Sequence, residues 1–581
     1  MRGKMDRLTR FFTKPKVSLQ RQYEAVRSIF VDKVSAASVA KKYGYSIKTI
    51  YSLVRDFKSG KLSFFEAKKR GPAGRRMPSQ TQQLVLHYRK KNLSAKDIRV
   101  RLEQDGYNCS IKTVERILSA AGAPKLHRRT LAELGKTLKN TIVPERSASL
   151  DFDNIQPFRY DCPVAGVFFF LPYLIESGII DVVKQSQLPQ SSEISAKQAC
   201  LSMLLLKILG SERLSHISDY DHEPGFGLFA GLNFLPKKSF MTTYSCRTSE
   251  ESLQNFQQQL MKIFQKKYPD FYRSGFINLD FHSIPHFGDQ SQMEKVWCGA
   301  RSKAIKGANT LFAQDGNSNA IIYTRADILR KNETEEIRQF VTYWKTIKNE
   351  VNETLVFDCK LTSYNVLDSL AQENIKFITL RKRNKALIAS TEKIPENQWQ
   401  KVYLLIPKRK YKACRIHVSE ITLPKCTLPV KQIIVTHNGR AQPTYIITNN
   451  TEIAIKDVLI VYAKRWHIEQ KFSELVSFFN LNALSSPLMI RIHFDILWTV
   501  ITDTLYHRFA QDLPRFEHER ADSIFRRFVN MPGQVIYDGN EFVIKIRKRA
   551  HTPILLGVKQ LQKSIKVPWL DNRQVRIEWT A

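Results

Sequence analysis

The sequence lacks the features of a secreted or membrane-inserted protein. Its eight cysteines are scattered and form no CxxC pair, which predicts reduced thiols in place of a zinc site or a disulfide framework. The N-terminus is basic but has no apolar core of a signal peptide. The longest apolar run, residues 163–175, contains Pro172, ends before Glu176 and is shorter than the roughly 18–20 residues of a bilayer span. We therefore expect a soluble cytoplasmic protein, with no membrane partner, in which this run is a buried helix pair.

Acidic residues are also scarce. The chain has 91 Lys and Arg against 54 Asp and Glu, a net charge of +37, which favours a polyanionic partner. Residues 1–130 alone hold 31 basic and 9 acidic side chains. This concentration predicts a nucleic-acid-binding region there, and a basic tail that only aids solubility is the alternative. A hydrophobic content of 43% over 581 residues predicts several folded domains, about four on length alone.

Two similar helical patterns occupy the basic region. Within residues 17–58, Ser35 begins a helix, Gly44 makes a turn and Ser46 caps a second helix. This layout is typical of a helix-turn-helix, whose second helix can enter the major groove of DNA. The string SIKTI at residues 46–50 recurs as SIKTV within a second helical pattern at residues 80–122. We predict two helix-turn-helix units, with ordinary helical hairpins as the alternative. The side chains expected to face DNA are Lys48, Thr49, Tyr51, Lys112 and Thr113.

A segment rich in Gly, Pro and basic side chains, residues 68–78, joins the two units. Such a linker can follow a phosphate backbone or lie in a minor groove, and it can equally be a solvated tether. Its Arg70, Arg75 and Arg76 are candidate DNA contacts. The expected domains of this half are the first helix-turn-helix at 1–60, the linker with the second at 61–130, and a helical connecting domain at 131–270.

Three acidic residues adjoin strongly apolar segments. Asp280 ends the run GFINLD, Asp358 ends TLVFD, and Glu469 lies in the helical run 457–480. One face of that run is mostly apolar, so a buried Glu469 needs a cation beside it. Two strand-borne aspartates and a helix-borne glutamate can form the all-oxygen site that Mg²⁺ prefers. The residues of the shared helical face step by three or four: Tyr462, Arg465, Glu469, Phe472 and Val476.

The segments around the acids predict a mixed sheet. Residues 276–380 follow the order β-β-β-α-β-α-β, with a turn at Asp315 and Gly316 between two of the strands. This order matches the ribonuclease H-like fold, in which the first and fourth strands are neighbours, so Asp280 and Asp358 would lie side by side. The expected fold class is multidomain α/β. Its remaining parts are the core at 271–390 and 451–515, a β-rich insertion at 391–450, and a basic C-terminal region at 516–581.

The C-terminal region contains a predicted hairpin around Asp538 and Gly539. Its outgoing strand, EFVIKIRKR, indicates either a basic surface or an edge strand protected by its charges. Two basic clusters of the β-rich insertion could line a nucleic-acid groove or be solvated: residues 381–385 and 408–412.

These residues resemble the DDE transposases of bacterial insertion sequences. The similar stretches are LDFHSIPHFGD around Asp280, LVFDCKLTSY around Asp358, and YAKRWHIE with FFNLNALSSP around Glu469. The similarity covers roughly residues 270–510. In one large subgroup of that family the third helix carries Tyr, Arg, Glu and Lys at fixed spacing. Here Tyr462, Arg465 and Glu469 match it, but Val476 stands at the lysine position. Lys471 cannot replace that lysine because it points to another side of the helix.

The resemblance implies a transposase that binds terminal inverted repeats, cuts beside them and joins the freed ends to target DNA. It also implies at least a homodimer in a synaptic complex, in the nucleoid of a bacterial cytoplasm. Two Mg²⁺ ions about 4 Å apart, or Mn²⁺ as a substitute, would assist nucleophile and leaving oxygen. Asp280 would bridge them, and Asp358 and Glu469 would each hold one. A DNA nuclease and a non-catalytic DNA-binding regulator are the alternatives. The expected DNA contacts near the acids are Tyr462, Arg465 and Lys360.

Several residues also have a purely structural interpretation. Arg465 could form a structural ion pair, and Tyr462 could be a core tyrosine. His282 and His286 lie near Asp280, but no histidines recur at the other two acids, so we expect structural histidines and no zinc cluster. Three tryptophans could stack on a flipped base, although packing in a core or interface is favoured: Trp297, Trp344 and Trp399.

Overall fold

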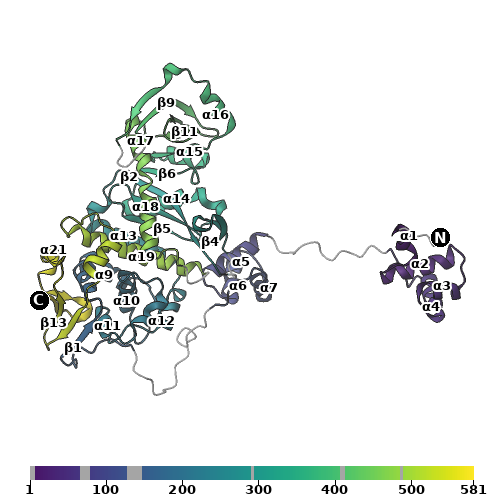
Figure 1. Ribbon diagram of the computed structural model, residues 1–581, viewed down its shortest axis with the longest axis horizontal. Helices are drawn as coiled ribbons and strands as arrows, with labels where there is room; N and C mark the ends of the chain where they lie inside the picture. Colours follow the sequence, from purple (N-terminus) through teal and green to yellow (C-terminus); the bar gives the residue numbers. More distant parts are fainter. Residues whose placement is uncertain (1–6, 66–78, 127–146, 289–292, 406–411, 484–487) are drawn as a thin grey trace. The chain divides into compact units, whose positions relative to one another are not determined.

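The computed structural model describes residues 7–65, 79–126, 147–288, 293–405, 412–483 and 488–581 (Figure 1). The protein is a mixed α/β multidomain chain, as predicted, and it contains one large mixed sheet. Its residues divide into two compact units, 1–79 and 80–581. The predicted linker contacts Arg70, Arg75 and Arg76 lie outside the described residues.

The first unit is a small helical bundle. Ser35 accepts a hydrogen bond from the Ser38 N–H, Gly44 takes the left-handed φ of 72°, and Ser46 accepts from the Thr49 N–H. The predicted caps and turn are therefore confirmed. A core of Ala25, Val39, Ala40, Tyr43 and Ile50 holds together α2 (Ser18–Phe30), α3 (Ala36–Tyr43) and α4 (Ile47–Lys58). Helix α1 (Arg7–Thr13) precedes them.

The second unit begins with three more helices: α5 (Ser79–Lys90), α6 (Ala95–Gln104) and α7 (Ile111–Ala120). Ser94 and Asp97 form a reciprocal capping box at the start of α6. Ser110 caps α7 by accepting from the Thr113 N–H at 3.2 Å, and Ser46 caps α4 in the same way. The repeated SIKT string is thus a shared capping motif at the start of the last helix in each of two trios, α2–α4 and α5–α7.

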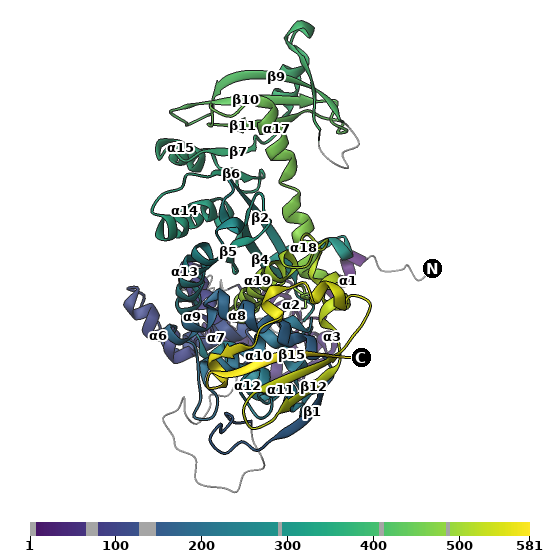
Figure 2. The same cartoon turned by 90° about the vertical axis from the view of Figure 1, so that its left-hand side faces the viewer.

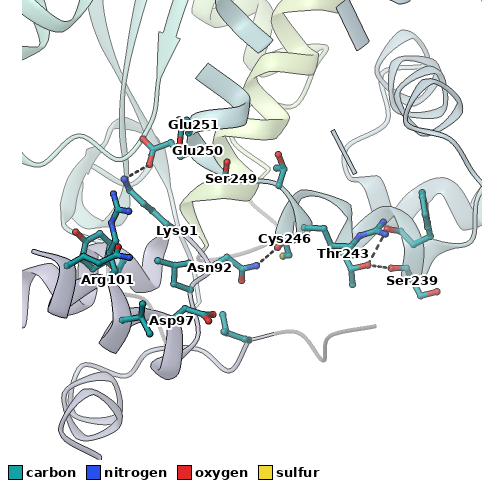
Figure 3. Close-up of a pocket in the computed structure, with 18 residues that line it drawn as sticks. Lys91, Asn92, Asp97, Arg101, Ser239, Thr243, Cys246, Ser249, Glu250 and Glu251 are labelled. Carbon is teal, nitrogen blue, oxygen red and sulfur yellow. Dashed lines mark hydrogen bonds and ion pairs between the residues drawn. The ribbon is translucent and has the colours of Figure 1, made fainter. Parts of the chain in front are cut away.

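This second trio packs against the rest of its unit through polar contacts (Figure 3). Lys90 pairs with Asp327 at 2.9 Å, and Lys91 pairs with Glu250 at 3.1 Å. Asn92 donates to the Cys246 carbonyl at 2.5 Å. A cavity of about 1080 Å³ lies between α5–α6 and the start of α13. Asp280, Asp358 and Glu469 are not among the residues that line this cavity.

The large sheet carries the predicted core strands. Their order across the sheet is β5-β4-β2-β6-β7, and β3 pairs with the outer end of β4. The first and fourth predicted strands, β2 and β6, are parallel neighbours, as expected. However, β2 does not end at Asp280; it continues to Pro285 because the residues after Asp280 pair with β4. The strands are β2 (Phe276–Pro285), β3 (Lys295–Cys298), β4 (Lys303–Asp315), β5 (Ile321–Arg325), β6 (Thr354–Phe357) and β7 (Phe377–Leu380).

The predicted β-rich segment is an extension of the same sheet (Figure 2). Its last strand, β11, pairs antiparallel with β7, and β10, β9 and β8 follow in order. The strands are β8 (Gln400–Tyr403), β9 (Ala413–Thr422), β10 (Pro429–Thr436) and β11 (Thr444–Thr448). Three helices precede this segment along the chain. Helix α14 (Glu336–Lys348) lies between β5 and β6, α15 (Tyr364–Gln372) lies between β6 and β7, and α16 (Lys385–Glu392) follows β7.

The helical run that carries Glu469 is broken, whereas the sequence predicted one continuous helix. It consists of α17 (Ile455–Lys464) and α18 (His467–Ser477), with Arg465 and Trp466 between them. At the break, the Ile468 and Glu469 N–H groups bond to carbonyls three residues back, which tightens the turn. The next helix, α19 (Met489–Gln511), is buried along most of its length.

The segment before the sheet is mostly helical, as its pattern predicted, with one exception. Strand β1 (Phe158–Cys162) pairs antiparallel with β12 near the C-terminus. The buried apolar run at residues 163–175 forms a 3₁₀ helix and α8. Among the described residues no single helix is long and apolar enough to cross a membrane. One bent helix pair, Ala165–Ser177 with Ile179–Gln185, has the length and composition of a membrane span. The helices are α8 (Leu171–Ser177), α9 (Ile179–Gln185), α10 (Ala196–Ile208), α11 (Pro224–Phe229), α12 (Lys238–Tyr244) and α13 (Glu250–Lys267).

The C-terminal residues build a second sheet of order β1-β12-β13-β15-β14. The predicted hairpin around Asp538 and Gly539 joins β12 to β13. The edge-strand interpretation of β13 is wrong, because β13 lies between β12 and β15. The elements are α20 (Ala521–Ile524), β12 (Gly533–Tyr537), β13 (Phe542–Arg547), α21 (Thr552–Leu555), β14 (Ile565–Val567) and β15 (Arg573–Thr580).

Candidate active site

Two neighbouring parallel strands bring Asp280 and Asp358 together. Leu279 on β2 is the register partner of Phe357 on β6. Asp280 directly follows Leu279, and Asp358 directly follows Phe357. Asp280 is buried, and Asp358 is half-buried just beyond the end of β6. The negative charge of Asp358 is close enough to raise the pKa of Asp280. The predicted side-by-side placement of the two aspartates is therefore confirmed.

Arg465 links these strands to the helix of Glu469. Its Nη1 lies 2.5 Å from Oδ2 of Asp280, and its Nη2 lies 3.6 Å from Oε1 of Glu469. The Arg465 side chain is 14% exposed, whereas that of Glu469 is 62% exposed. The expectation of a buried Glu469 is therefore wrong. The residue that needs the cation is Asp280, because the break between α17 and α18 turns Glu469 towards solvent.

Burial dominates the electrostatics of this cluster. It raises the pKa of Asp280 to about 6; Arg465 opposes the rise and Asp358 adds to it. Burial also raises the pKa of the Tyr462 phenol to about 12, again with Arg465 opposing and Asp358 adding. Tyr462 is half-buried against the cluster formed by the extended sheet and α17. Tyr462 thus packs partly in the core, as its structural interpretation expected. The centroid of its ring also lies 5.8 Å from the guanidinium carbon of Arg465.

A cavity of about 730 Å³ lies over this cluster. Asp358, Arg465 and Glu469 line one side, together with Tyr462 and Trp466. Four cationic side chains also line the cavity: Arg381, Lys382 and Arg383, which follow β7, and Arg440, in the connection between β10 and β11. Three residues of the first predicted basic cluster, 381–383, therefore line the cavity. Of the second cluster, residues 408–411 lie outside the described residues.

The donor set suits a hard divalent cation, because all three predicted ligands are carboxylates. The described residues nevertheless contain no group of three His, Cys, Asp or Glu side chains close enough to hold a metal ion as they stand. Asp280 is engaged by Arg465, and Oδ1 of Asp358 accepts from the Lys360 N–H at 2.8 Å. The chemistry fits Mg²⁺, and assembling the site requires the Arg465 and Glu469 side chains to move.

The other positions of the predicted helix signature are accounted for. Lys471 is buried and paired with Asp503 at 2.7 Å and with Glu474 at 3.1 Å. It therefore points into the core, whereas its helical position predicted only that it faces another side of the helix than Glu469. Val476 is half-buried and packs against the main hydrophobic core. The subgroup's lysine position thus has a packing role in this chain.

The predicted N-terminal contacts lie on the accessible sides of their helices. Lys48, Thr49 and Tyr51 are exposed on α4, and Lys112 is exposed on α7. The Thr49 hydroxyl lies 2.8 Å from that of Ser46, and the Thr113 hydroxyl lies 2.9 Å from that of Ser110. Both threonines therefore take part in helix capping. Lys360 is exposed beside Asp358. Their roles as DNA contacts stay predictions.

The histidines and tryptophans divide between core and surface. His282 bonds to the Asn482 side chain at 2.9 Å and packs on Phe472, which confirms a structural role. His286 lies at the end of β2, and within the described residues its Nε2 has no hydrogen-bond partner. Trp344 is buried and donates to Glu353, as expected of a core residue. Trp399 packs beside Arg415. Trp297 is 60% exposed, so it is not a core residue, and the alternative of interface packing stays a prediction.

Sequence reasoning missed two residues of the cavity, Trp466 and Arg440. In the continuous helix that the sequence predicts, Trp466 has no special position. In the structure it lies at the break between α17 and α18 and lines the cavity. Arg440 lies in the connection between β10 and β11, about 80 residues from Asp358 along the chain. No local pattern indicates that this connection returns to the acids.

Comparison with known protein families finds a match in the part of the chain that contains the three acids. Residues 274–502 match the family model of the transposase DDE domain, which confirms the predicted resemblance for that part of the chain. A search of curated proteins found no significant match.

Solved transposase structures also align with the chain. A piggyBac transposase synaptic complex with hairpin DNA aligns at 12% identity over 67% of this chain and 82% of that chain, with a TM-score of 0.33. A Mos1 transposase paired-end complex with left transposon end aligns at 12% identity over 62% and 76%, with a TM-score of 0.13. TM-scores this low do not establish a shared overall fold.

Proposed function

We propose that the chain is an insertion-sequence transposase that cleaves DNA and transfers strands by a DDE mechanism. The observation that carries this proposal is the Asp280–Arg465–Glu469 link beside Asp358, within the matched DDE domain and under a cavity lined by cations. Carboxylates for divalent ions and nearby guanidinium groups for phosphates are the side chains that phosphodiester chemistry needs.

The sheet supports a ribonuclease H-like core. Its order β5-β4-β2-β6-β7 combines three antiparallel strands with two parallel ones and puts the two aspartates on adjacent central strands. In the proposed division, residues 271–390 and 451–515 form this core. Residues 391–450 are an insertion that widens the sheet and adds one cation, Arg440, to the cavity.

Asp280, Asp358 and Glu469 would hold the divalent ions, Mg²⁺ or Mn²⁺. When bound, two such ions activate the nucleophile and stabilise the leaving oxygen. In their absence Arg465 supplies the positive charge that the buried Asp280 requires. Arg465 would also be able to bind a DNA phosphate bidentately. Arg381, Lys382, Arg383 and Arg440 would bind neighbouring phosphates across the cavity.

The two helical trios would bind the terminal inverted repeats as helix-turn-helix units. Their support is the exposed start of α4 and α7, with Lys48, Tyr51 and Lys112 accessible beside capped helix N-termini. The linker contacts Arg70, Arg75 and Arg76 belong to the same proposal. Bringing two element ends together requires at least a homodimer on DNA, in the nucleoid of a bacterial cytoplasm.

The test is a cleavage and joining assay with DNA that carries the element's ends. Asp280→Ala, Asp358→Ala and Glu469→Ala should each abolish Mg²⁺-dependent nicks and joined products while binding of end DNA is retained. Asp181→Ala, which removes an exposed carboxylate on α9, is the matched control and should leave both reactions unchanged.

The rival functions give different results in the same assay. Nicks that depend on all three acids but never yield joined products would assign the chain as a nuclease. End binding without nicks in the unaltered protein would assign it as a DNA-binding regulator. Nicks that persist in any of the three alanine variants would refute the acid assignment.

A further inference from the structure

A short two-stranded ribbon projects from the catalytic sheet beyond β2. Strand β2 ends where Pro285 pairs with Gly307, and the preceding residues of β4, 303–306, pair with β3. We call β3 (Lys295–Cys298) together with residues 303–306 the ribbon. Val296 and Cys298 are buried on one of its faces, whereas Lys295 and Trp297 are exposed on the other.

The exposed face combines a flat aromatic ring with opposed cations. Trp297 is 60% exposed and lies opposite Ala304, while Lys295 lies directly opposite Lys306. An exposed tryptophan forgoes the gain of burial, so Trp297 does not stabilise the ribbon itself. The exposed ring with Lys295 beside it suits an anionic partner that also offers flat rings.

A second aromatic residue with a cation lies beside the ribbon. Phe287, just after β2, is 59% exposed, and the guanidinium carbon of Arg301 lies 4.4 Å from its ring centroid. Arg301 comes from the 3₁₀ turn Gly299–Arg301 that joins β3 to β4. The ribbon and this turn therefore present two aromatic rings interleaved with cations, the combination by which proteins bind single strands of nucleic acid.

The register relates this face to the acids. Asp280 lies opposite Phe312 on β4, and Trp297 lies opposite Ala304. Residues 312 and 304 differ by an even number, so their side chains leave the same face of β4. Near Phe312 this face is covered by Phe472 of α18, and at the ribbon it is open. Eight residues at roughly 3.4 Å each separate the two points, or about 27 Å along the strand.

We propose that the ribbon binds a DNA strand leading away from the acids, with Trp297 stacked on an unpaired base. Lys295, Lys306 and Arg301 bind the phosphates on either side of that base. The separation of about 27 Å corresponds to roughly eight nucleotides at the 3.4 Å rise of a duplex strand. This inference rests on the proposed function, since it takes the DNA of that reaction as the occupant. An unpaired base is favoured over an intact duplex because only an unpaired base offers its face to the indole.

The experiment measures binding of the full-length protein to two labelled DNAs by fluorescence anisotropy, without Mg²⁺. One is a fully paired duplex, and the other is the same duplex with a single-stranded tail. The unaltered protein should prefer the tailed DNA. Trp297→Ala should lower affinity for the tailed DNA by roughly tenfold, with little change for the duplex, and Trp297→Phe should retain most of the preference.

Two matched variants sharpen the result. Tyr403→Ala removes an aromatic side chain of similar exposure, 57%, on β8 away from the ribbon and should leave the preference unchanged. Lys295→Gln should weaken binding to the tailed DNA and reduce its salt dependence by about one counterion. The binding assay contains no Mg²⁺ and requires no cleavage, so its result does not depend on whether the chain is catalytically active. Failure of the catalytic proposal therefore stays distinguishable from failure of this one.

An unchanged tail preference in Trp297→Ala would overturn the inference. If that result came with a shift from dimer to monomer in sedimentation, the ribbon would be assigned to contact with a second copy of the chain. The melting temperature of Trp297→Ala should match that of the unaltered protein, because the side chain is mostly exposed.

Discussion

At the residue scale, Arg465 determines the state of the acid cluster. Its guanidinium holds the buried Asp280 carboxylate at 2.5 Å and also reaches Glu469. A buried charge that loses its partner is far more costly than a pair that is removed together. The same side chain also lowers the pKa of Asp280, which burial would otherwise raise further. Arg465 is therefore both a structural partner and a regulator of carboxylate ionisation.

This arrangement predicts the behaviour of an Arg465→Ala variant. The loss of the cation should destabilise the protein by about 3–5 kcal/mol, because Asp280 is left buried without a partner. The double variant Asp280→Asn with Arg465→Ala should be less destabilised than Arg465→Ala alone. Urea unfolding of the two variants and of Asp280→Asn provides the comparison. Equal losses in the single and double variants would show that the pair contributes nothing beyond packing.

A second consequence concerns ionisation of Asp280. In the unaltered, metal-free protein its pKa is raised to about 6, so it is mostly ionised at pH 7. Removing Arg465 should move this pKa upward, and the carboxyl should be mostly protonated near neutrality. Carbon-13 NMR of labelled aspartate, with Asp280→Asn to assign the signal, measures the change. An unchanged or lower pKa in Arg465→Ala would contradict the role given to Arg465.

At the element scale, helix capping was predictable and helix continuity was not. The caps at Ser35 and Ser46 depend on residues within one turn, so the local sequence is sufficient to predict them. The adjacency of β2 and β6 followed from the order of elements. The break at Arg465 and Trp466 did not, because helical periodicity continues through it. Its geometry depends on Arg465 meeting Asp280 on a strand 185 residues away.

Other elements could not be predicted because they too depend on contacts between residues far apart in the sequence. Strand β1 pairs with β12, which lies in a distant part of the sequence, and nothing near Phe158 indicates that partner. The β-rich segment was recognised as strands, but its union with β7 is a long-range pairing. In the candidate site, the three acids and Arg465 were predictable as residue types. The exposure of Glu469 and the contribution of Arg440 depended on the break and on the connection between β10 and β11.

The shared capping motif makes a prediction for α7. Ser110→Ala removes the side-chain acceptor for the Thr113 N–H and should destabilise the helix by about 1 kcal/mol. Hydrogen exchange of the α7 amides should then accelerate about fivefold if they exchange by local opening. Ser119→Ala, an exposed position near the end of the same helix, is the control and should have little effect. Similar exchange in both variants would contradict a capping role for Ser110.

At the scale of the whole molecule, cations are distributed over every surface assigned to DNA. They lie on α4 and α7, on the wall of the acid cavity and on the ribbon. The interior, in contrast, contains charge clusters that are mostly buried. One lies where α5 meets the core and includes Asp327, Glu250 and His493. Titration of this cluster should therefore change the free energy of unfolding with pH, whereas the exposed cations should not.

His493 is the residue of that cluster with the clearest titration. Burial lowers its pKa from 6.5 to about 4, with Glu250 opposing and Arg325 adding to the shift. Between pH 6.5 and 4 the unfolded chain therefore binds a proton that the folded chain does not, so the free energy of unfolding falls as the pH falls. The loss should reach about 3 kcal/mol near pH 4, from about 2.5 pKa units at 1.36 kcal/mol each.

The variant His493→Gln isolates this contribution. It retains a polar side chain of similar size but cannot titrate, so its free energy of unfolding should fall less than that of the unaltered protein between pH 6.5 and 4. Burial likewise lowers the pKa of His507 to about 4 and raises that of Asp503 to about 6, but both residues are present in the two proteins and cancel in the difference. Urea unfolding at half-unit pH intervals measures it. Parallel stability curves would mean that His493 already binds its proton in the folded state, and that Glu250 outweighs burial at this contact between α5 and the catalytic core.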